Sequence, residues 1–414
     1  MLFFSTVYLA MVLVIFWSYC GYLIFLYLSA IFSNEEPAAS TTLQAGKEVM
    51  HVVVACYNES EMILQKVRNL EELSFPAERL RVTFVDGQST DRTRELLQAA
   101  IADKPGWSLL VSPEKGKIHQ LNHFLDSTPD AEYVMCTDAD AILQPDAPAK
   151  LFNVMLDNED VGVVGAHISP KNGLAVDEHF WSDQNNVRQF ESRVHSAFIV
   201  VAPCYLFRAS VLRRFPDDCV ADDVYAAFKA NSTGWRVLQV QDAFGFELRN
   251  PGTMSEYFRH KFRKVNAFVM ELLRFSYRFP TFPGKFKIIY ASKIFQILIS
   301  PWLVFLFFPA TLSLILSRGS LRDLAGMSVL FLFVSMLVSS LIMKAGRRSF
   351  ITAAGPTQKK GMILVTFFLN NFIMLWAGAC FPFYRQDCSY RKCRAAAPRQ
   401  ETGAIETTVV CAGR

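Results

Sequence analysis

His51-Val52-Val53-Val54-Ala55-Cys56-Tyr57-Asn58-Glu59 is the stretch that decides the fold class of this chain. It begins as a continuous apolar run, which is typical of a strand buried on both faces, and it ends in a polar turn. Residues 61–73 follow with the spacing of an amphipathic helix. A strand, a turn and a helix in this order predict an α/β unit with a parallel, Rossmann-like sheet.

The same pattern continues along the chain. Further strands are predicted at 81–85, 107–111 and 133–137, with a helix over 94–101 between the first two. The second strand ends at Asp86, and the fourth ends at Asp138-Ala139-Asp140. Ligands of parallel α/β sheets bind beyond the carboxyl ends of the strands. We therefore expect these acids and the Tyr57–Glu59 turn to surround one site.

Asp138 and Asp140 are candidate metal ligands. Carboxylates two residues apart in a turn can converge on one hard cation, and Mg²⁺ or Mn²⁺ is usually held by one or two carboxylates together with phosphate oxygens. The alternative is a solvated acidic turn without a ligand. The position of the pair at a strand end, near the other acids, favours the metal site.

Two further sequence elements could take part in binding a diphosphate and in catalysis. Lys117 follows Gly116 at the start of a predicted helix, where its charge and the free N–H groups of the first turn would both attract a diphosphate. Asp222-Asp223 precede an amphipathic helix. They could be an N-cap with first-turn charge, or one of them could be a general base for a hydroxyl nucleophile.

The composition excludes several classes of protein. The 414 residues are 51% hydrophobic and 19% charged, which excludes disorder and makes a wholly soluble protein improbable. A net charge of +4, without a basic run that contains aromatic residues, argues against nucleic acid as a partner. The 9 cysteines include no Cys-x-x-Cys pair, so neither a disulfide scaffold nor a zinc ribbon is expected.

The apolar residues gather at both ends of the chain. Residues 1–33 carry no charge and are long enough to cross a membrane. A cleaved signal peptide would need a positive start and a shorter apolar core, so we expect an anchor. Three more apolar stretches run over about 288–316, 324–343 and 362–383, and the last could be a full span or a segment that returns to the same side.

The sequence also indicates how the chain meets the membrane. Residues 254–279 alternate apolar and cationic residues at helical spacing, which favours an interfacial helix over a core helix. The loop after the third apolar stretch is strongly basic, and such loops are cytoplasmic. With four spans the catalytic domain lies on that cytoplasmic side. The loop's basic residues are Lys344, Arg347, Arg348, Lys359 and Lys360.

The ordered set of motifs resembles the family-2 inverting glycosyltransferases, in particular the membrane synthases of cellulose, chitin and hyaluronan. The resemblance covers about residues 48–270 and implies a GT-A nucleotide-sugar fold. It rests on Ala55-Cys56-Tyr57-Asn58-Glu59, Val85-Asp86-Gly87-Gln88-Ser89-Thr90-Asp91, Gly116-Lys117, Asp138-Ala139-Asp140, Pro203-Cys204-Tyr205-Leu206-Phe207-Arg208 and Asp222-Asp223.

This resemblance implies a role for each matching residue. It implies that Tyr57, Glu59 and Asp86 bind the nucleoside and that Lys117 and Arg263 contact the nucleotide phosphates. The resemblance also implies Mg²⁺ or Mn²⁺ on Asp138 and Asp140, with Asp138 close to the donor diphosphate. Asp223 inherits the role of the general base, and Asp222 and Cys204 lie on the acceptor side.

Two departures bear on the activity. After the second strand, only the first acid of the family's Asp-Asp-Gly is kept, as Asp86-Gly87-Gln88. Processive members carry Gln-x-x-Arg-Trp, and here His260 and Lys264 replace the Gln and the Trp while Arg263 is kept. The missing Trp places processive polymerisation in doubt but not sugar transfer.

These observations predict five regions and one activity. The regions are an N-terminal membrane helix (1–33), a GT-A catalytic domain (34–252), amphipathic interfacial helices (253–285), about three membrane segments (286–384) and a polar tail (385–414). The expected activity is a membrane-bound inverting transfer from a nucleotide-sugar donor, with UDP as the expected nucleotide, to a lipid-linked or saccharide acceptor. The alternatives are a processive polysaccharide synthase and a non-catalytic membrane scaffold that keeps the fold.

Overall fold

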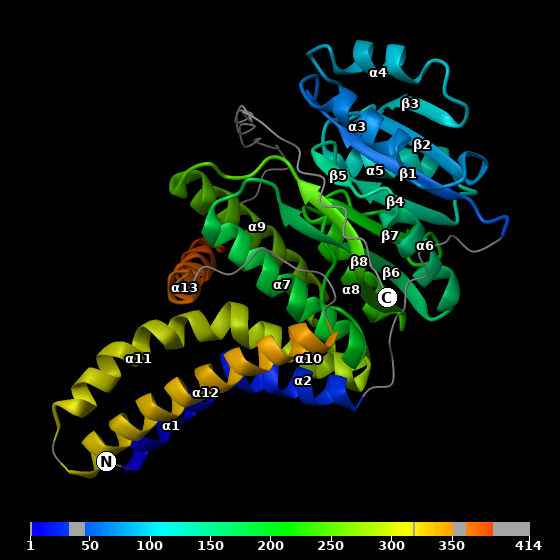
Figure 1. Ribbon diagram of the computed structural model, residues 1–414. Helices are drawn as coiled ribbons and strands as arrows, with labels where there is room; N and C mark the ends of the chain where they lie inside the picture. Colours follow the sequence, from blue (N-terminus) through cyan, green and yellow to red (C-terminus); the bar gives the residue numbers. More distant parts are fainter. Residues whose placement is uncertain (1, 33–45, 318, 351–361, 384–414) are drawn as a thin grey trace, which may run out of the picture.

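An eight-stranded sheet forms the centre of the computed structural model, which describes residues 2–32, 46–317, 319–350 and 362–383. The strand order is β3-β2-β1-β4-β7-β6-β8-β5 (Figure 1). The strands are β1 (Met50–Cys56), β2 (Leu80–Asp86), β3 (Trp107–Val111), β4 (Tyr133–Thr137), β5 (Ala141–Leu143), β6 (Val161–Pro170), β7 (Cys204–Arg208) and β8 (Arg236–Glu247).

The sheet is mixed, whereas the sequence predicted a parallel one. The prediction is confirmed for β3, β2, β1 and β4, which pair in parallel. Two strands that were not among those predicted make the sheet mixed: β7 lies antiparallel between β4 and β6, and β5 is antiparallel to β8. Apolar periodicity reveals that a segment is a strand, but strand direction depends on how the long connection through α7 (Ala175–Val194) returns to the sheet.

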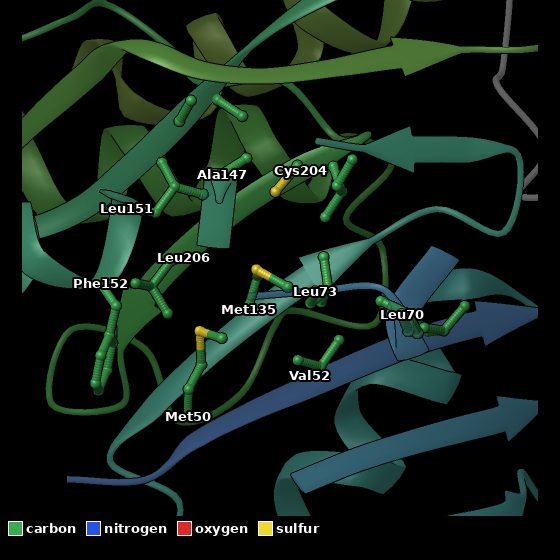
Figure 2. Packing of buried hydrophobic residues seen from close by; sticks show 14 of the residues in the cluster. Met50, Val52, Leu70, Leu73, Met135, Ala147, Leu151, Phe152, Cys204 and Leu206 are labelled. Atoms are coloured by element: carbon green, nitrogen blue, oxygen red, sulfur yellow. The ribbon is translucent and has the colours of Figure 1, made fainter. Parts of the chain in front are cut away.

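Helices cover both faces of the sheet. On one face lie α3 (Ile63–Glu71), α4 (Thr93–Ile101) and α6 (Ala147–Asp157), and on the other α5 (Lys117–Ser127) and α8 (Asp222–Ser232). Figure 2 shows the first core, where Met50, Val52 and Met135 of the strands meet Leu70 and Leu151 of the helices. Burying each such side chain contributes about 1.5–3 kcal/mol, which fixes the strand ends in place.

Among the described residues, three helical stretches are long and apolar enough to cross a membrane: Phe3–Ile31, Gly284–Ile315 and Ser320–Ala345. In Figure 1, α1, α11 and α12 project together away from the sheet, and α13 packs against α7, α9 and α11. The predicted tail at 385–414 lies outside the described residues. The helices are α1 (Leu2–Phe16), the π-helix η1 (Trp17–Gly21), α2 (Tyr22–Ile31), α9 (Met254–Ser276), α10 (Gly284–Ile294), the π-helix η4 (Phe295–Ile299), α11 (Ser300–Ile315), α12 (Ser320–Phe350) and α13 (Met362–Cys380).

A buried carboxylate attaches two of these stretches to the catalytic domain. Glu191 of α7 has no exposed surface, and its Oε1 accepts a hydrogen bond from the Tyr22 hydroxyl at 2.6 Å. The same oxygen lies 3.1 Å from Lys293 Nζ of α10. Its Oε2 accepts from the backbone N–H of Phe198 at 2.9 Å. One side chain therefore joins the first apolar stretch, the second one and the segment that follows α7.

The helix α9 differs from the predicted interfacial helix at the membrane surface. Lys261, expected on a cationic face toward lipid headgroups, is buried and lies 2.7 Å from Asp177 of α7. Its Nζ also lies 3.8 Å from the centre of the Phe180 ring. Tyr257 is fully buried and donates to Asn370 of α13 at 3.3 Å. The helix thus packs between the catalytic domain and α13 along much of its length.

We expect Glu191→Ala to destabilise the protein far more than Tyr22→Phe. The first change leaves Lys293 buried without its counter-charge, a loss that typically costs about 3–5 kcal/mol. The second removes one hydrogen bond, worth about 1 kcal/mol. Thermal unfolding of both variants in one detergent checks the order. Equal melting temperatures would show that the ion pair does not hold the helices to the domain.

Candidate functional site

The predicted site residues converge because their strands are neighbours. Tyr57 and Glu59 follow β1, Asp86 ends β2, and Asp138 follows β4, and these three strands pair directly in parallel. Their carboxyl ends therefore share one edge of the sheet. This edge therefore carries Glu59, Asp86 and Asp138, as the parallel pairing requires.

Two loops at this edge hold each other. Asn58 adopts the left-handed backbone conformation (φ 53°), which turns the chain sharply after β1. Its Oδ1 accepts from the backbone N–H of Thr90 at 2.8 Å, and its own N–H donates to Ser89 Oγ at 2.9 Å. The N–H of Glu59 donates to Thr93 Oγ1 at 2.7 Å. The turn after β1 is thereby fixed to the loop after β2.

Asp86 is fully buried and carries its own counter-ion. Arg94 of α4 places a guanidinium nitrogen 2.7 Å from Asp86 Oδ2. The N–H of Ser89 donates to both carboxylate oxygens at 3.2 and 3.3 Å. Sequence reasoning missed Arg94, although its position in the first turn of the next helix was a usable signal.

Glu59 is paired with a residue from a distant part of the chain. Its Oε2 lies 2.6 Å from Arg249, which follows β8, and both side chains are less than a tenth exposed. Tyr57 is half-buried, and Lys115 Nζ lies 5.9 Å from the centre of its ring. Arg249 was missed because nothing in its local sequence indicates that the segment after β8 reaches the turn after β1.

Lys117 joins the two acidic motifs. The chain enters α5 through Gly116, whose φ of 117° is unfavourable for any other residue. From this position Lys117 Nζ reaches Asp138 Oδ1 at 2.8 Å and Asp222 Oδ2 at 3.0 Å. Asp222 also accepts from the buried Tyr205 hydroxyl at 2.8 Å. Burial alone would lower the pKa of Lys117, but Asp138 and Asp222 raise that pKa well above its usual value.

Asp140 lies in an environment with too few positive charges. It is 7% exposed, and burial, followed by the nearby charges of Asp138 and Glu247, raises its pKa to about 7. Arg249 acts in the opposite direction, and Glu59 adds to the increase. An excess of carboxylates at one turn fits a divalent cation, whose charge would offset theirs.

The donor set limits how such a cation would be held. Within residues 2–32, 46–317, 319–350 and 362–383, no group of three His, Cys, Asp or Glu side chains is placed to hold a metal ion. A cation here would be held by Asp138 and Asp140, with the remaining ligands from a phosphate-bearing substrate and water. Oxygen ligands in this number suit Mg²⁺ or Mn²⁺.

Asp223 lies on the other side of Lys117. At the first turn of α8, its Oδ2 accepts from the N–H of Ala202 at 2.8 Å and its Oδ1 from the N–H of Val224 at 2.9 Å. Burial and then the charge of Asp222 raise its pKa to about 6, although Lys117 lowers it. A fixed carboxylate that titrates close to neutral pH is suited to accept a proton.

One of the predicted residues lies away from this cluster. Cys204, expected on the acceptor side, is fully buried at the start of β7 and packs in the core shown in Figure 2. That expectation is wrong because its side chain points into the layer under α3 and α6 and cannot reach a substrate. Arg263 lies half-buried on α9, and its expected contact with the nucleotide phosphates stays a prediction.

The position of the missing tryptophan has a distinct environment. Lys264 Nζ lies 3.8 Å from Glu247 and 5.2 Å from the centre of the Trp181 ring of α7. Trp181 is 6% exposed. Phe258, which could offer an aromatic face nearby, packs edge-on against Phe372 of α13 with ring centres 5.9 Å apart. Sequence reasoning missed Trp181 as a neighbour of this position.

A mixed sheet of this order, with acids at the ends of β1, β2 and β4 and a further acid pair at α8, is the architecture of GT-A glycosyltransferases. Residues 51–216 match the family described as glycosyl transferase family 2. Residues 51–216 of this chain are therefore similar to a family-2 glycosyltransferase domain.

Relatives and a solved structure are similar to larger parts of the chain. An N-acetylglucosaminyltransferase of Rhizobium leguminosarum bv. viciae is 25% identical over 254 residues, 56% of this chain and 58% of that protein. A poly-beta-1,6-N-acetyl-D-glucosamine synthase of Staphylococcus aureus is 23% identical over 193 residues, 45% of this chain and 46% of that protein. The chain thus spans about half the length of these relatives.

The fold is also that of a solved enzyme. The mannosyltransferase PcManGT from Pyrobaculum calidifontis, determined with GDP-Man and Mn²⁺, superposes with a TM-score of 0.66 and 22% identity. The match covers 90% of this chain and 98% of that one. The predicted GT-A architecture with additional apolar helices is confirmed.

We expect Asp140→Asn to stabilise the metal-free protein at pH 8. The folded state raises the pKa of this carboxyl to about 7, from 3.8, so it binds a proton that the unfolded chain lacks. The wild type therefore loses stability as the pH rises from about 4 to 7, by about 1.4 kcal/mol per unit. The amide of the Asp140→Asn variant does not ionise, so the variant does not lose stability in this way.

Thermal unfolding in chelator at pH 5 and pH 8 measures the effect. The variant's advantage is expected to be larger at pH 8. Asp130→Asn, a change at an exposed loop residue, is the control and leaves both melting temperatures unchanged. A variant less stable than wild type at pH 8 would show that the charge on Asp140 is already balanced.

Proposed function

We propose that this chain is a membrane-bound inverting glycosyltransferase that moves a sugar from a nucleotide-sugar donor to a lipid-linked or saccharide acceptor. The observation that carries this proposal is the contact of Lys117 with both Asp138 and Asp222. It brings the acid that would hold donor phosphates and the acid pair that would meet the acceptor into one site.

The donor would lie along the shared strand edge. Asp86 and Glu59 would face the nucleoside together with Tyr57, and Lys117 would face the diphosphate. A divalent cation on Asp138 and Asp140 supplies Lewis-acid stabilisation of the leaving diphosphate. The names of the bacterial relatives favour an N-acetylglucosamine donor, and this sugar is carried as a UDP conjugate, so we propose UDP as the nucleotide.

The chain's own residues would supply the remaining chemistry. The acceptor hydroxyl attacks C1 of the donor sugar as the bond from C1 to the diphosphate oxygen breaks, and Asp223 takes the hydroxyl proton. One displacement of this kind inverts the anomeric centre. Lys117 would offset the charge that develops on the diphosphate, which is the usual work of a fixed cation in a buried site.

A membrane location follows from the attached helices. Two of the three long apolar stretches are joined to the domain through Glu191, so the site would face substrates at the membrane surface. The basic residues at 344–360, three of which lie in the last turns of α12, favour a cytoplasmic catalytic domain, where nucleotide sugars are made. A non-catalytic scaffold is disfavoured, because it would gain nothing from two buried acids held at pKa values of about 6 and 7.

We expect Asp223→Asn to lower turnover about 10²-fold or more and to leave donor affinity close to that of wild type. The amide keeps the shape but cannot accept the proton. In the wild type the pKa of about 6 requires activity to fall tenfold per pH unit below pH 6, because the base becomes protonated.

Steady-state rates with radiolabelled donor from pH 5 to 8 test this role. Asp218→Asn, at an acid whose side chain is 74% exposed, is the matched control and keeps wild-type turnover. A loss confined to donor affinity in the Asp223 variant would make Asp223 a binding residue and would place the base elsewhere.

We expect the product to carry one or a few sugars. A processive enzyme must hold the end of a growing chain, and an aromatic face does so by stacking on the sugar. Lys264 offers a hydrated charge instead, and the Trp181 ring beneath it is buried. Processive synthesis is the second candidate, favoured by the name of the Staphylococcus aureus relative and by the closeness of Trp181.

Membranes that contain the protein would be incubated with radiolabelled UDP-N-acetylglucosamine and Mn²⁺, and the product would be sized. Short, chelator-sensitive product supports the proposal. High-molecular-weight polysaccharide would favour the second candidate, and no transfer from any of a panel of nucleotide sugars would contradict the proposed activity.

A further inference from the structure

The helix α3 carries two buried polar side chains on the face that meets the sheet. Lys66 has no exposed surface, and Asn69, three residues later, is 5% exposed. Side chains three residues apart lie on the same face of a helix. The other residues of this face, such as Ile63, Val67 and Leu70, are the apolar residues that packing requires.

Lys66 holds both ends of the turn that carries Asp138 and Asp140. Its Nζ donates to Thr137 Oγ1 and to the carbonyl oxygen of Ala141, each at 2.7 Å. These two residues directly precede and follow the acidic turn. The ammonium therefore lies behind the turn, on the side away from the strand edge where a donor would bind.

Asn69 holds the strand that follows the turn. Its Nδ2 donates to the carbonyl oxygen of Leu143 at 2.7 Å, and its Oδ1 accepts from the N–H of the same residue at 2.9 Å. Both backbone groups of Leu143 are thus bound by one side chain. In Figure 1, α3 lies beside β5, the short strand that contains Leu143.

A buried lysine is costly unless its position serves a purpose. Removing an ammonium from water costs several kcal/mol, and an apolar side chain of similar volume would fill the same space without that cost. Here the charge faces a turn with two carboxylates, and the hydrogen bonds of Lys66 to Thr137 and Ala141 end on the residues directly before and after that turn.

We propose that Lys66 and Asn69 form a clamp that positions the acidic turn for a divalent cation. The inference rests on the proposed metal role of Asp138 and Asp140. A cation site with only two protein ligands depends on their spacing, because distances near 2.1 Å and octahedral directions leave little freedom. Groups behind the ligands commonly set this spacing.

The clamp also reaches the segment that holds the proposed base. Thr137 Oγ1 donates to the carbonyl oxygen of Pro203 at 2.8 Å, and the preceding residue, Ala202, donates its N–H to Asp223. Lys66 therefore acts on positioning at both acidic motifs without facing either substrate.

Mn²⁺ alone is the probe, with the free ion measured by electron paramagnetic resonance on purified full-length protein. We expect Lys66→Met and Asn69→Ala each to weaken Mn²⁺ binding at least tenfold. Removing the positive charge of Lys66 would remove its Coulomb repulsion of Mn²⁺, and this effect alone would tighten Mn²⁺ binding. A weaker affinity in Lys66→Met therefore reports geometry, and an unchanged or tighter affinity would overturn the proposal.

Hydrogen–deuterium exchange supplies a second readout that does not depend on the metal. The peptide covering residues 137–144 is expected to exchange faster in both variants. Lys150→Met is the matched control. Lys150 is a buried lysine of α6, and its Nζ donates to the backbone carbonyl oxygen of Asp242 at 2.8 Å, away from the turn. It leaves both readouts unchanged. If Lys66→Met does not fold, the milder Asn69→Ala carries the test.

Asp140→Asn separates the two claims. If this variant binds Mn²⁺ like wild type, or if wild type binds none, the proposed metal site fails and the exchange experiment still tests the clamp. If Asp140→Asn loses Mn²⁺ but Lys66→Met and Asn69→Ala bind it normally, the metal site stands and the clamp is overturned. If Lys66 and Asn69 act as one unit, their effects on Mn²⁺ binding are not additive. The double variant is then expected to bind Mn²⁺ about as tightly as the single variant with the lower affinity.

Discussion

The contact of Lys117 with Asp138 and Asp222 is the interaction on which the site depends. Each acid comes from a different half of the chain, and neither could be buried beside the other without a shared cation. The position of Lys117 is in turn set by Gly116, whose backbone conformation starts α5 at the right place. Sheet order, helix start and charge balance are therefore parts of one constraint.

A second constraint connects this site to the apolar helices. Glu191 binds Tyr22, Lys293 and the N–H of Phe198, and four residues later the N–H of Ala202 binds Asp223. The segment that orients the proposed base is thus held at one end by the membrane-proximal junction. Solubilising the domain without its helices would remove two of the three partners of Glu191.

Local sequence was sufficient for the donor side of the site and insufficient for its surroundings. The strands that end at Asp86 and Asp138 are continuous apolar runs, and adjacent parallel strands must share an edge, so Tyr57, Asp86 and Asp138 could be placed together in advance. Arg249 and Lys66 could not, because their partners lie far away in sequence. Cys204 was misplaced because a family motif indicates a strand but not which face each of its residues occupies.

The two halves of the domain are coupled at two points, which bears on how catalysis is organised. Lys117 bridges Asp138 and Asp222, and Thr137 bridges β4 and Pro203. A cation and a diphosphate bound at Asp138 would weaken the ion pair between Asp138 and Lys117. Lys117 is the charge that lowers the pKa of Asp223. If Lys117 turned toward the phosphate on donor binding, the pKa of Asp223 would rise and this carboxylate would become a stronger base. The geometry thus supports an order in which the base becomes fully competent only after the donor is bound.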